Sequence, residues 1–180
     1  MTASFSDALV LFGVTGDLAH KMIFPALYAM AKRDTLKVPV IGVAFENWSP
    51  ADLRNRVKDS IKRSGGIDNH RAFHHLLSLL SYVSGDYNDG STFTKNKETL
   101  GRARRPAHYL AIPPSLFPTV ITGLGAADLA DHARVIVEKP FGRDLASARE
   151  LNRIARSVFP EESIFRIDHF LAKEAIMNIL

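Results

Sequence analysis

Apolar and polar positions along the chain follow two alternating patterns. Short runs of β-branched apolar residues, typical of buried strands, alternate with longer stretches in which apolar residues recur at helical spacing. The short runs predict strands near Ala8–Phe12, Val38–Phe45, Leu80–Ser84, His108–Ile112, Arg134–Glu138 and Ser163–Ile167. The longer stretches predict helices near Asp17–Lys32, Ala51–Ser64, Asn69–Leu77, Ser91–Gly101, Ser115–Leu124, Leu145–Arg156 and Ala172–Leu180. Ser49 is expected to cap the second of these helices, and Asp68 or Asn69 the third. This alternation is typical of an α/β protein with a doubly wound parallel sheet of about six strands and helices on both faces.

Composition places these elements in one domain. The 180 residues are 46% hydrophobic, enough for one buried core, so we expect residues 1–180 to form a single domain. The absence of cysteine excludes a disulfide framework, a thiolate metal site and a cysteine nucleophile. A net charge of +4 suits phosphates and nucleotides without choosing among anionic ligands. No run of residues resembles a membrane span or a secretory leader, so we expect a cytoplasmic protein without membrane contact.

A glycine turn follows the first predicted strand. Gly13 and Gly16 are spaced as in a turn that enters a helix, and Ala19 is small enough for close packing of helix and strand. Such a turn brings backbone N–H groups and a helix N-terminus to an anion, which predicts a Rossmann-type site for the pyrophosphate of a dinucleotide. The alternative is an ordinary strand–turn–helix connection in which Asp17 caps the helix.

The same turn carries a resemblance to a known family. Followed by Lys21 and residues 25–27, it resembles the opening signature of glucose-6-phosphate dehydrogenases. Three later blocks resemble that family's motifs in order: residues 111–117 its Pro-Pro segment, 137–142 its Glu-Lys-Pro-Phe-Gly motif and 166–174 its active-site signature. The resemblance implies coenzyme contacts from Gly13, Thr15, Gly16, Asp17, Leu18, Phe45, Glu46, Pro113, Pro114 and Lys139.

The substrate groups are expected at the carboxyl ends of two strands. Lys139 and the Asp168–His169 pair each follow a predicted strand, and open α/β sheets bind ligands at that edge. His169 and Lys173 lie four residues apart and, on a helix, share a face that suits a sugar phosphate. The resemblance implies that these two residues bind the phosphate of glucose 6-phosphate, that Lys139 hydrogen-bonds the sugar and that Asp168 orients a catalytic histidine. A solvated lysine and a capped helix start are the structural alternatives.

The resemblance also implies the reaction and what this chain lacks. The family oxidises glucose 6-phosphate at C1 to 6-phosphoglucono-lactone with hydride transfer to NAD(P), the first step of the pentose phosphate pathway. Its general-base histidine and its homo-oligomer interface belong to a second domain, and none of the seven histidines here matches that base. We therefore expect this chain to be the NAD(P)-binding domain, without the C-terminal domain and poorly active alone. A non-catalytic dinucleotide-binding module is the alternative.

Coenzyme choice is expected to depend on the end of the second strand. The family often carries an arginine there that pairs with the 2′-phosphate of NADP, whereas this chain has Phe45 followed by Glu46. A carboxylate at this place can accept hydrogen bonds from the ribose hydroxyls of NAD and repels a 2′-phosphate. The sequence therefore favours NAD over NADP. The alternative is that Glu46 faces solvent and another lysine or arginine meets the phosphate.

Two further patterns have a solvated helix surface as the alternative. His70 and His74 have a spacing that can chelate a metal, but no carboxylate follows at a third-ligand position, so we expect no metal site. Residues 102–106 carry three arginines that suit a nucleic acid, but no aromatic interleaving accompanies them. We expect no nucleic-acid partner.

Overall fold

A computed structural model of the chain describes residues 5–167. Its single sheet has six strands: β1 (Ala8–Phe12), β2 (Val40–Ala44), β3 (Leu80–Ser84), β4 (Pro106–Leu110), β5 (Arg134–Glu138) and β6 (Ile164–Ile167). Their order is β3-β2-β1-β4-β5-β6, and every neighbouring pair is parallel. The predicted doubly wound parallel sheet is confirmed.

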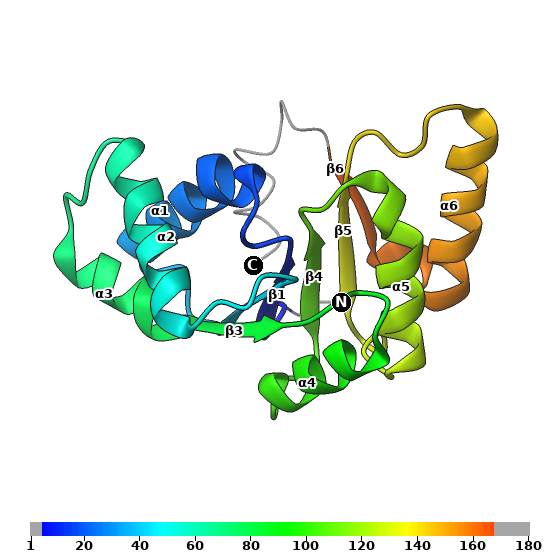
Figure 1. Ribbon diagram of the computed structural model, residues 1–180, viewed down its shortest axis with the longest axis horizontal. Helices are drawn as coiled ribbons and strands as arrows, with labels where there is room; N and C mark the ends of the chain where they lie inside the picture. The colour runs from blue at the N-terminus through cyan, green and yellow to red at the C-terminus, as the bar shows by residue number, and fades with distance from the viewer. Residues whose placement is uncertain (1–4, 168–180) are drawn as a thin grey trace.

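Helices cover both faces of this sheet. A π-helical segment η1 (Ala19–Ile23) leads into α1 (Phe24–Lys32), which packs with α2 (Pro50–Arg63) and α3 (His70–Leu79) over one face. The other face carries α4 (Gly90–Leu100), α5 (Phe117–Ala126) and α6 (Leu145–Val158). Two 3-10 turns, η2 (Pro114–Leu116) and η3 (Glu161–Ser163), complete the described elements. Figure 1 shows α1 to α3 grouped at one end of the sheet and α5 and α6 at the other.

The arrangement of the two helical layers indicates which edge of the sheet is suited to bind a ligand. Because the helices change face between β3 and β4, the connections that leave β1 and β4 diverge at their carboxyl ends. Such a switch point opens a crevice at the edge of an α/β sheet. The glycine turn leaves β1 at this point.

Side-chain caps start several helices as the sequence predicts. Ser49 accepts a hydrogen bond from the Asp52 amide while the Asp52 carboxylate accepts one from the Ser49 amide, which is a capping box. Of the two residues expected to cap α3, Asn69 is the cap, since its side chain accepts from the Ala72 amide. The described part of the chain contains no helix that is long and apolar enough to span a bilayer.

Some predicted boundaries were wrong. The strand expected at His108–Ile112 is displaced to Pro106–Leu110, because its register aligns Ala8 with Pro106. Proline is tolerated as the first residue of a strand, where it marks an end of the ladder. The strand expected at Val38–Phe45 is shorter, Val40–Ala44. The helix expected at Ser115–Leu124 is divided into η2 and α5.

The first helix also differs from its prediction in one respect. Helical residues run from position 17 to position 32 as expected, but Ala19–Ile23 adopt π-helical hydrogen bonding. Short π segments inside helices occur often near functional sites. The remaining described helices begin and end within two residues of their predicted ends.

Candidate functional site

The turn after β1 requires glycine at its first position. Gly13 has φ +78°, a left-handed conformation, and a Cβ placed there would lie 2.2 Å from the Ala111 carbonyl oxygen in the connection after β4. The Gly16 amide donates to the Gly13 carbonyl at 3.0 Å and closes the turn. Gly13 therefore fixes the turn against the switch point.

The turn after Gly13 contains backbone N–H groups without a protein acceptor. Within residues 5–167, the amides of Val14 and Thr15 donate no hydrogen bond to a protein acceptor. Helical residues start at Asp17, so the first helical amides follow immediately. A set of free N–H groups at a helix start is a site for an anion such as a pyrophosphate. Binding of a pyrophosphate by this turn stays a prediction.

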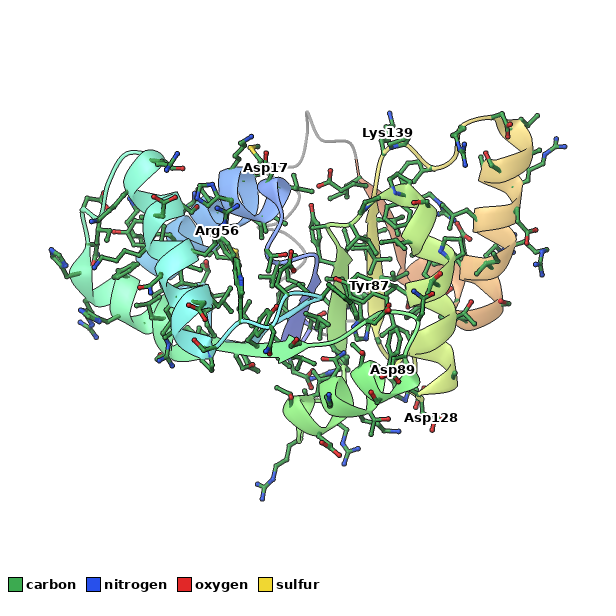
Figure 2. The ribbon with its side chains drawn as sticks, viewed as in Figure 1. Asp17, Arg56, Tyr87, Asp89, Asp128 and Lys139 are labelled. Atoms are coloured by element: carbon green, nitrogen blue, oxygen red, sulfur yellow. The ribbon has the colours of Figure 1, made fainter. Side chains whose placement is uncertain are left out.

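Asp17 does not cap the helix. Its carboxylate accepts a hydrogen bond from the Lys21 ammonium at 2.7 Å, and this bond lowers the pKa of Asp17 below its usual value. Arg56, reaching from α2, lies 4.0 Å from the same carboxylate and donates to the Thr15 carbonyl at 3.3 Å. Figure 2 shows Asp17 and Arg56 close together beside the sheet. Two cationic side chains, Lys21 and Arg56, thus lie beside Asp17 at the start of the helix.

The end of β2 lies against the same turn. Phe45 is 73% exposed, and the exposed Glu46 accepts a hydrogen bond from the Thr15 hydroxyl at 2.8 Å. The Tyr82 hydroxyl donates to the Glu46 carbonyl at 2.6 Å, so both the backbone and the side chain of Glu46 are held. The Glu46 carboxylate therefore points toward the glycine turn at the start of the helix.

The other half of the edge carries the expected substrate lysine. Pro113 and Pro114 follow β4 and begin η2, and the exposed Lys139 follows β5. The Lys139 amide donates to the Ile167 carbonyl at 3.2 Å, which fixes its backbone to the last residue of β6. In Figure 2, Asp17 and Lys139 both lie at the upper edge of the sheet, Asp17 to the left and Lys139 to the right. Asp168, His169 and Lys173 lie outside the described residues, as does the helix predicted at 172–180.

A buried polar pair includes Glu138, the residue before Lys139. Glu138 is 6% exposed and accepts a hydrogen bond from the hydroxyl of Tyr109, a buried residue of β4. Burial raises the pKa of Tyr109, and the hydrogen bond and charge of Glu138 raise it further. The phenol therefore remains protonated and acts as a donor at neutral pH.

Sequence reasoning did not identify Arg56, Tyr82 or Tyr87 as neighbours of the glycine turn. The Tyr87 hydroxyl lies 2.9 Å from the Gly13 amide nitrogen, although the two residues are 74 positions apart. Tyr82 lies in β3 and Tyr87 in the connection that follows it, so polar aromatic residues near a strand end were the available signal. Among the described residues, no three metal-ligating side chains form a group that could hold an ion, so His70 and His74 gain no third ligand.

The doubly wound sheet and the glycine turn at its switch point define a dinucleotide-binding domain of the Rossmann type. Residues 10–178 match the family described as "Glucose-6-phosphate dehydrogenase, NAD binding domain". The chain belongs to the glucose-6-phosphate dehydrogenase family, of which it contains the coenzyme-binding domain.

Individual relatives agree with this assignment. The chain is 44% identical over 174 residues to "Glucose-6-phosphate 1-dehydrogenase 1" of Mycobacterium tuberculosis, covering 97% of this chain and 37% of the relative. It superposes on the crystal structure of glucose-6-phosphate 1-dehydrogenase from Mycobacterium avium with a TM-score of 0.89 at 46% identity, covering 93% of this chain and 37% of the other. A structure titled "Glucose-6-phosphate dehydrogenase in complex with its substrate glucose-6-phosphate" gives a TM-score of 0.85 at 34% identity, covering 98% and 40%. The chain thus spans well under half the length of these relatives.

Proposed function

We propose that this chain forms the coenzyme half of an enzyme that oxidises glucose 6-phosphate at C1 with hydride transfer to a nicotinamide dinucleotide. The observation that carries the proposal is the turn at Gly13 and Gly16, whose free N–H groups lie at the switch point on the same edge as Lys139. The names of the relatives support the substrate and the reaction.

The residues of this chain have separate tasks in the proposed reaction. The amides after Gly13 bind the pyrophosphate, and Pro113 and Pro114 lie along the coenzyme toward the sugar. When bound, the nicotinamide ring accepts the hydride that leaves C1. Lys139, which is exposed at the carboxyl end of β5, hydrogen-bonds the sugar, as the resemblance to the family implies. The resemblance to the family implies phosphate binding by His169 and Lys173, and the orientation of a catalytic histidine by Asp168.

Turnover by the 180-residue chain alone tests how much of the enzyme it contains. We expect it to bind coenzyme but to reduce it poorly with glucose 6-phosphate, because none of its seven histidines matches the family's general base. Loss of a positioned base lowers a rate by about 10²–10⁴-fold. Robust turnover without a partner chain contradicts this expectation, whereas coenzyme binding with no turnover at all favours a binding module.

We further propose that this domain prefers NAD to NADP. The support is the position of Glu46, which the Thr15 hydroxyl and Tyr82 hold beside the turn, together with Phe45 in place of an arginine. A fixed carboxylate accepts hydrogen bonds from a ribose diol and repels a 2′-phosphate. Arg56 supplies positive charge nearby, but it is engaged with the Thr15 carbonyl beneath the turn.

The coenzyme preference is tested by titrating NAD and NADP into the same protein and into Phe45→Arg. We expect NAD to bind at least as tightly to the unmodified chain, and Phe45→Arg to improve NADP binding by about tenfold through a charge-assisted hydrogen bond. Phe5→Arg is the matched control, because Phe5 is 70% exposed and the same charge is added to another surface. Tenfold tighter binding of NADP to the unmodified chain contradicts the roles given to Phe45 and Glu46.

A further inference from the structure

The Tyr87 hydroxyl occupies the point where three loops at the edge of the sheet meet. It lies 2.9 Å from the Gly13 amide nitrogen after β1 and donates to the Val43 carbonyl of β2 at 3.0 Å. Tyr87 itself belongs to the connection after β3. The Gly13 amide also donates to the Val43 carbonyl at 2.9 Å, so its single hydrogen is shared between two acceptors. One phenol thus joins the ends of β1, β2 and β3.

The loop that carries Tyr87 is itself firmly built. The Thr92 hydroxyl donates to the Asp86 carbonyl, and the Asp89 carboxylate accepts from the Ser91 amide at the start of α4. The Tyr87 ring packs edge-on against Phe12 with 5.7 Å between ring centroids. These contacts hold the Tyr87 side chain in place, so its hydroxyl stays beside Gly13.

The chemistry of this hydroxyl suits a lasting contact. Burial raises the pKa of Tyr87 to about 12, so the phenol is neutral at physiological pH and can accept from one backbone group while donating to another. Its removal leaves the direct bond between Gly13 and Val43 in place. The sheet ladder is thereby preserved, and what changes is the freedom of the turn that follows it.

We propose that Tyr87 is a positioning residue for the coenzyme, which orients the glycine turn for the pyrophosphate by holding its first amide. This inference rests on the proposed binding of a dinucleotide at Gly13 and Gly16. It assigns Tyr87 no contact with the reacting atoms. A single neutral hydrogen bond of this kind corresponds to a change in affinity of about three- to tenfold.

The test compares Tyr87→Phe with Tyr28→Phe. Tyr28 is a matched control, because its hydroxyl also accepts from a backbone amide, that of Asn69, and donates to an oxygen, that of Asp68, but within the α1–α3 layer. NAD is titrated into both variants, and amide hydrogen exchange is measured at Gly13 and Gly16. We expect Tyr87→Phe to weaken NAD binding about three- to tenfold and to speed exchange in the turn, and Tyr28→Phe to do neither.

Each outcome separates this inference from the proposed function. If the unmodified chain binds no dinucleotide, the proposed function fails, and the exchange rates still decide whether Tyr87 holds the turn. If NAD binds the unmodified chain and Tyr87→Phe with equal affinity, or if Tyr28→Phe weakens binding as much, Tyr87 is not a positioning residue.

Discussion

The polar side chains around the glycine turn and those inside the second half of the sheet differ in burial. In the half formed by β1 to β3, Thr15, Glu46 and Tyr87 meet around the glycine turn in exposed or half-buried positions. In the half formed by β4 to β6, His108 and Glu138 are buried inside the sheet layers. A polar group at the surface can orient a ligand at little cost in stability, whereas a buried one contributes to stability through the partner it satisfies. The first half is therefore expected to govern coenzyme affinity, and the second the free energy of unfolding.

Gly13→Ala is expected to have the largest effect in the first half. A Cβ would lie 2.2 Å from the Ala111 carbonyl oxygen at φ +78°, so the turn must move. We expect NAD affinity to fall by at least about 100-fold, or about 3 kcal/mol. Gly101→Ala is the control for backbone strain alone, since φ is +57° there and nothing lies within 4 Å of the added carbon. Equal losses of NAD affinity in both variants would falsify the close approach as the cause.

The pH dependence of unfolding tests the second half. Burial lowers the pKa of His108 to about 4, although its hydrogen bond to the Leu129 carbonyl favours the protonated ring. The unfolded chain binds a proton near pH 6.5 and the folded chain does not. Stability is therefore lost as pH falls from about 6.5 to about 4, by on the order of 2–3 kcal/mol.

His108→Gln provides the comparison for that experiment. The amide can still donate to the Leu129 carbonyl but has no proton to gain, so the pH slope between about 6.5 and about 4 should decrease. Urea unfolding at several pH values measures the slope in both proteins. Identical pH slopes in the two proteins would show that the loss of stability at low pH comes from carboxylates elsewhere and not from His108.

Tyr109→Phe tests the buried pair formed by Tyr109 and Glu138. The substitution removes the hydroxyl that donates to the Glu138 carboxylate while the ring remains. We expect the free energy of unfolding to fall by about 1–2 kcal/mol, because a buried acceptor loses a donor, with NAD affinity unchanged. A change in affinity without a change in stability would break the division between the two halves.

The smallest expected effect comes from Thr15→Val. The substitution preserves the shape of the side chain but removes the hydrogen bond to the Glu46 carboxylate at 2.8 Å. We expect the preference for NAD over NADP to narrow about two- to tenfold, while the unfolding midpoint stays close to that of the unmodified chain. Parallel titrations of both coenzymes measure the ratio, and an unchanged ratio removes Thr15 from the determinants of choice.

Local signals predicted most of the fold and the turn. Alternation of short and long apolar patterns predicted every strand of the sheet. Ser49 was predicted as a cap, and Asn69 as one of two candidates, because capping depends on residues a few positions away. Gly13 and Gly16 were predictable because their conformations depend on the local turn. These signals lie within short windows of sequence.

Contacts between distant residues were not predictable. The hydrogen bonds from Thr15 to Glu46 and from Gly13 to Tyr87 join residues 31 and 74 positions apart, and no spacing rule relates them. They arise only when the ends of parallel strands meet at one edge. The roles of Asp168, His169 and Lys173 stay predictions, because those residues lie outside the described part of the chain.

Amide chemical shifts recorded during an NAD titration test the central claim most directly. If the glycine turn binds the pyrophosphate, the largest changes will occur at Val14, Thr15, Gly16 and Asp17, with smaller ones at Glu46 and Lys139. The contrary result is a set of changes confined to another surface, such as the hollow of about 690 Å³ between α4 and α5 that Asn88, Thr94 and Thr122 line. Saturable binding with no change at the turn would contradict the account.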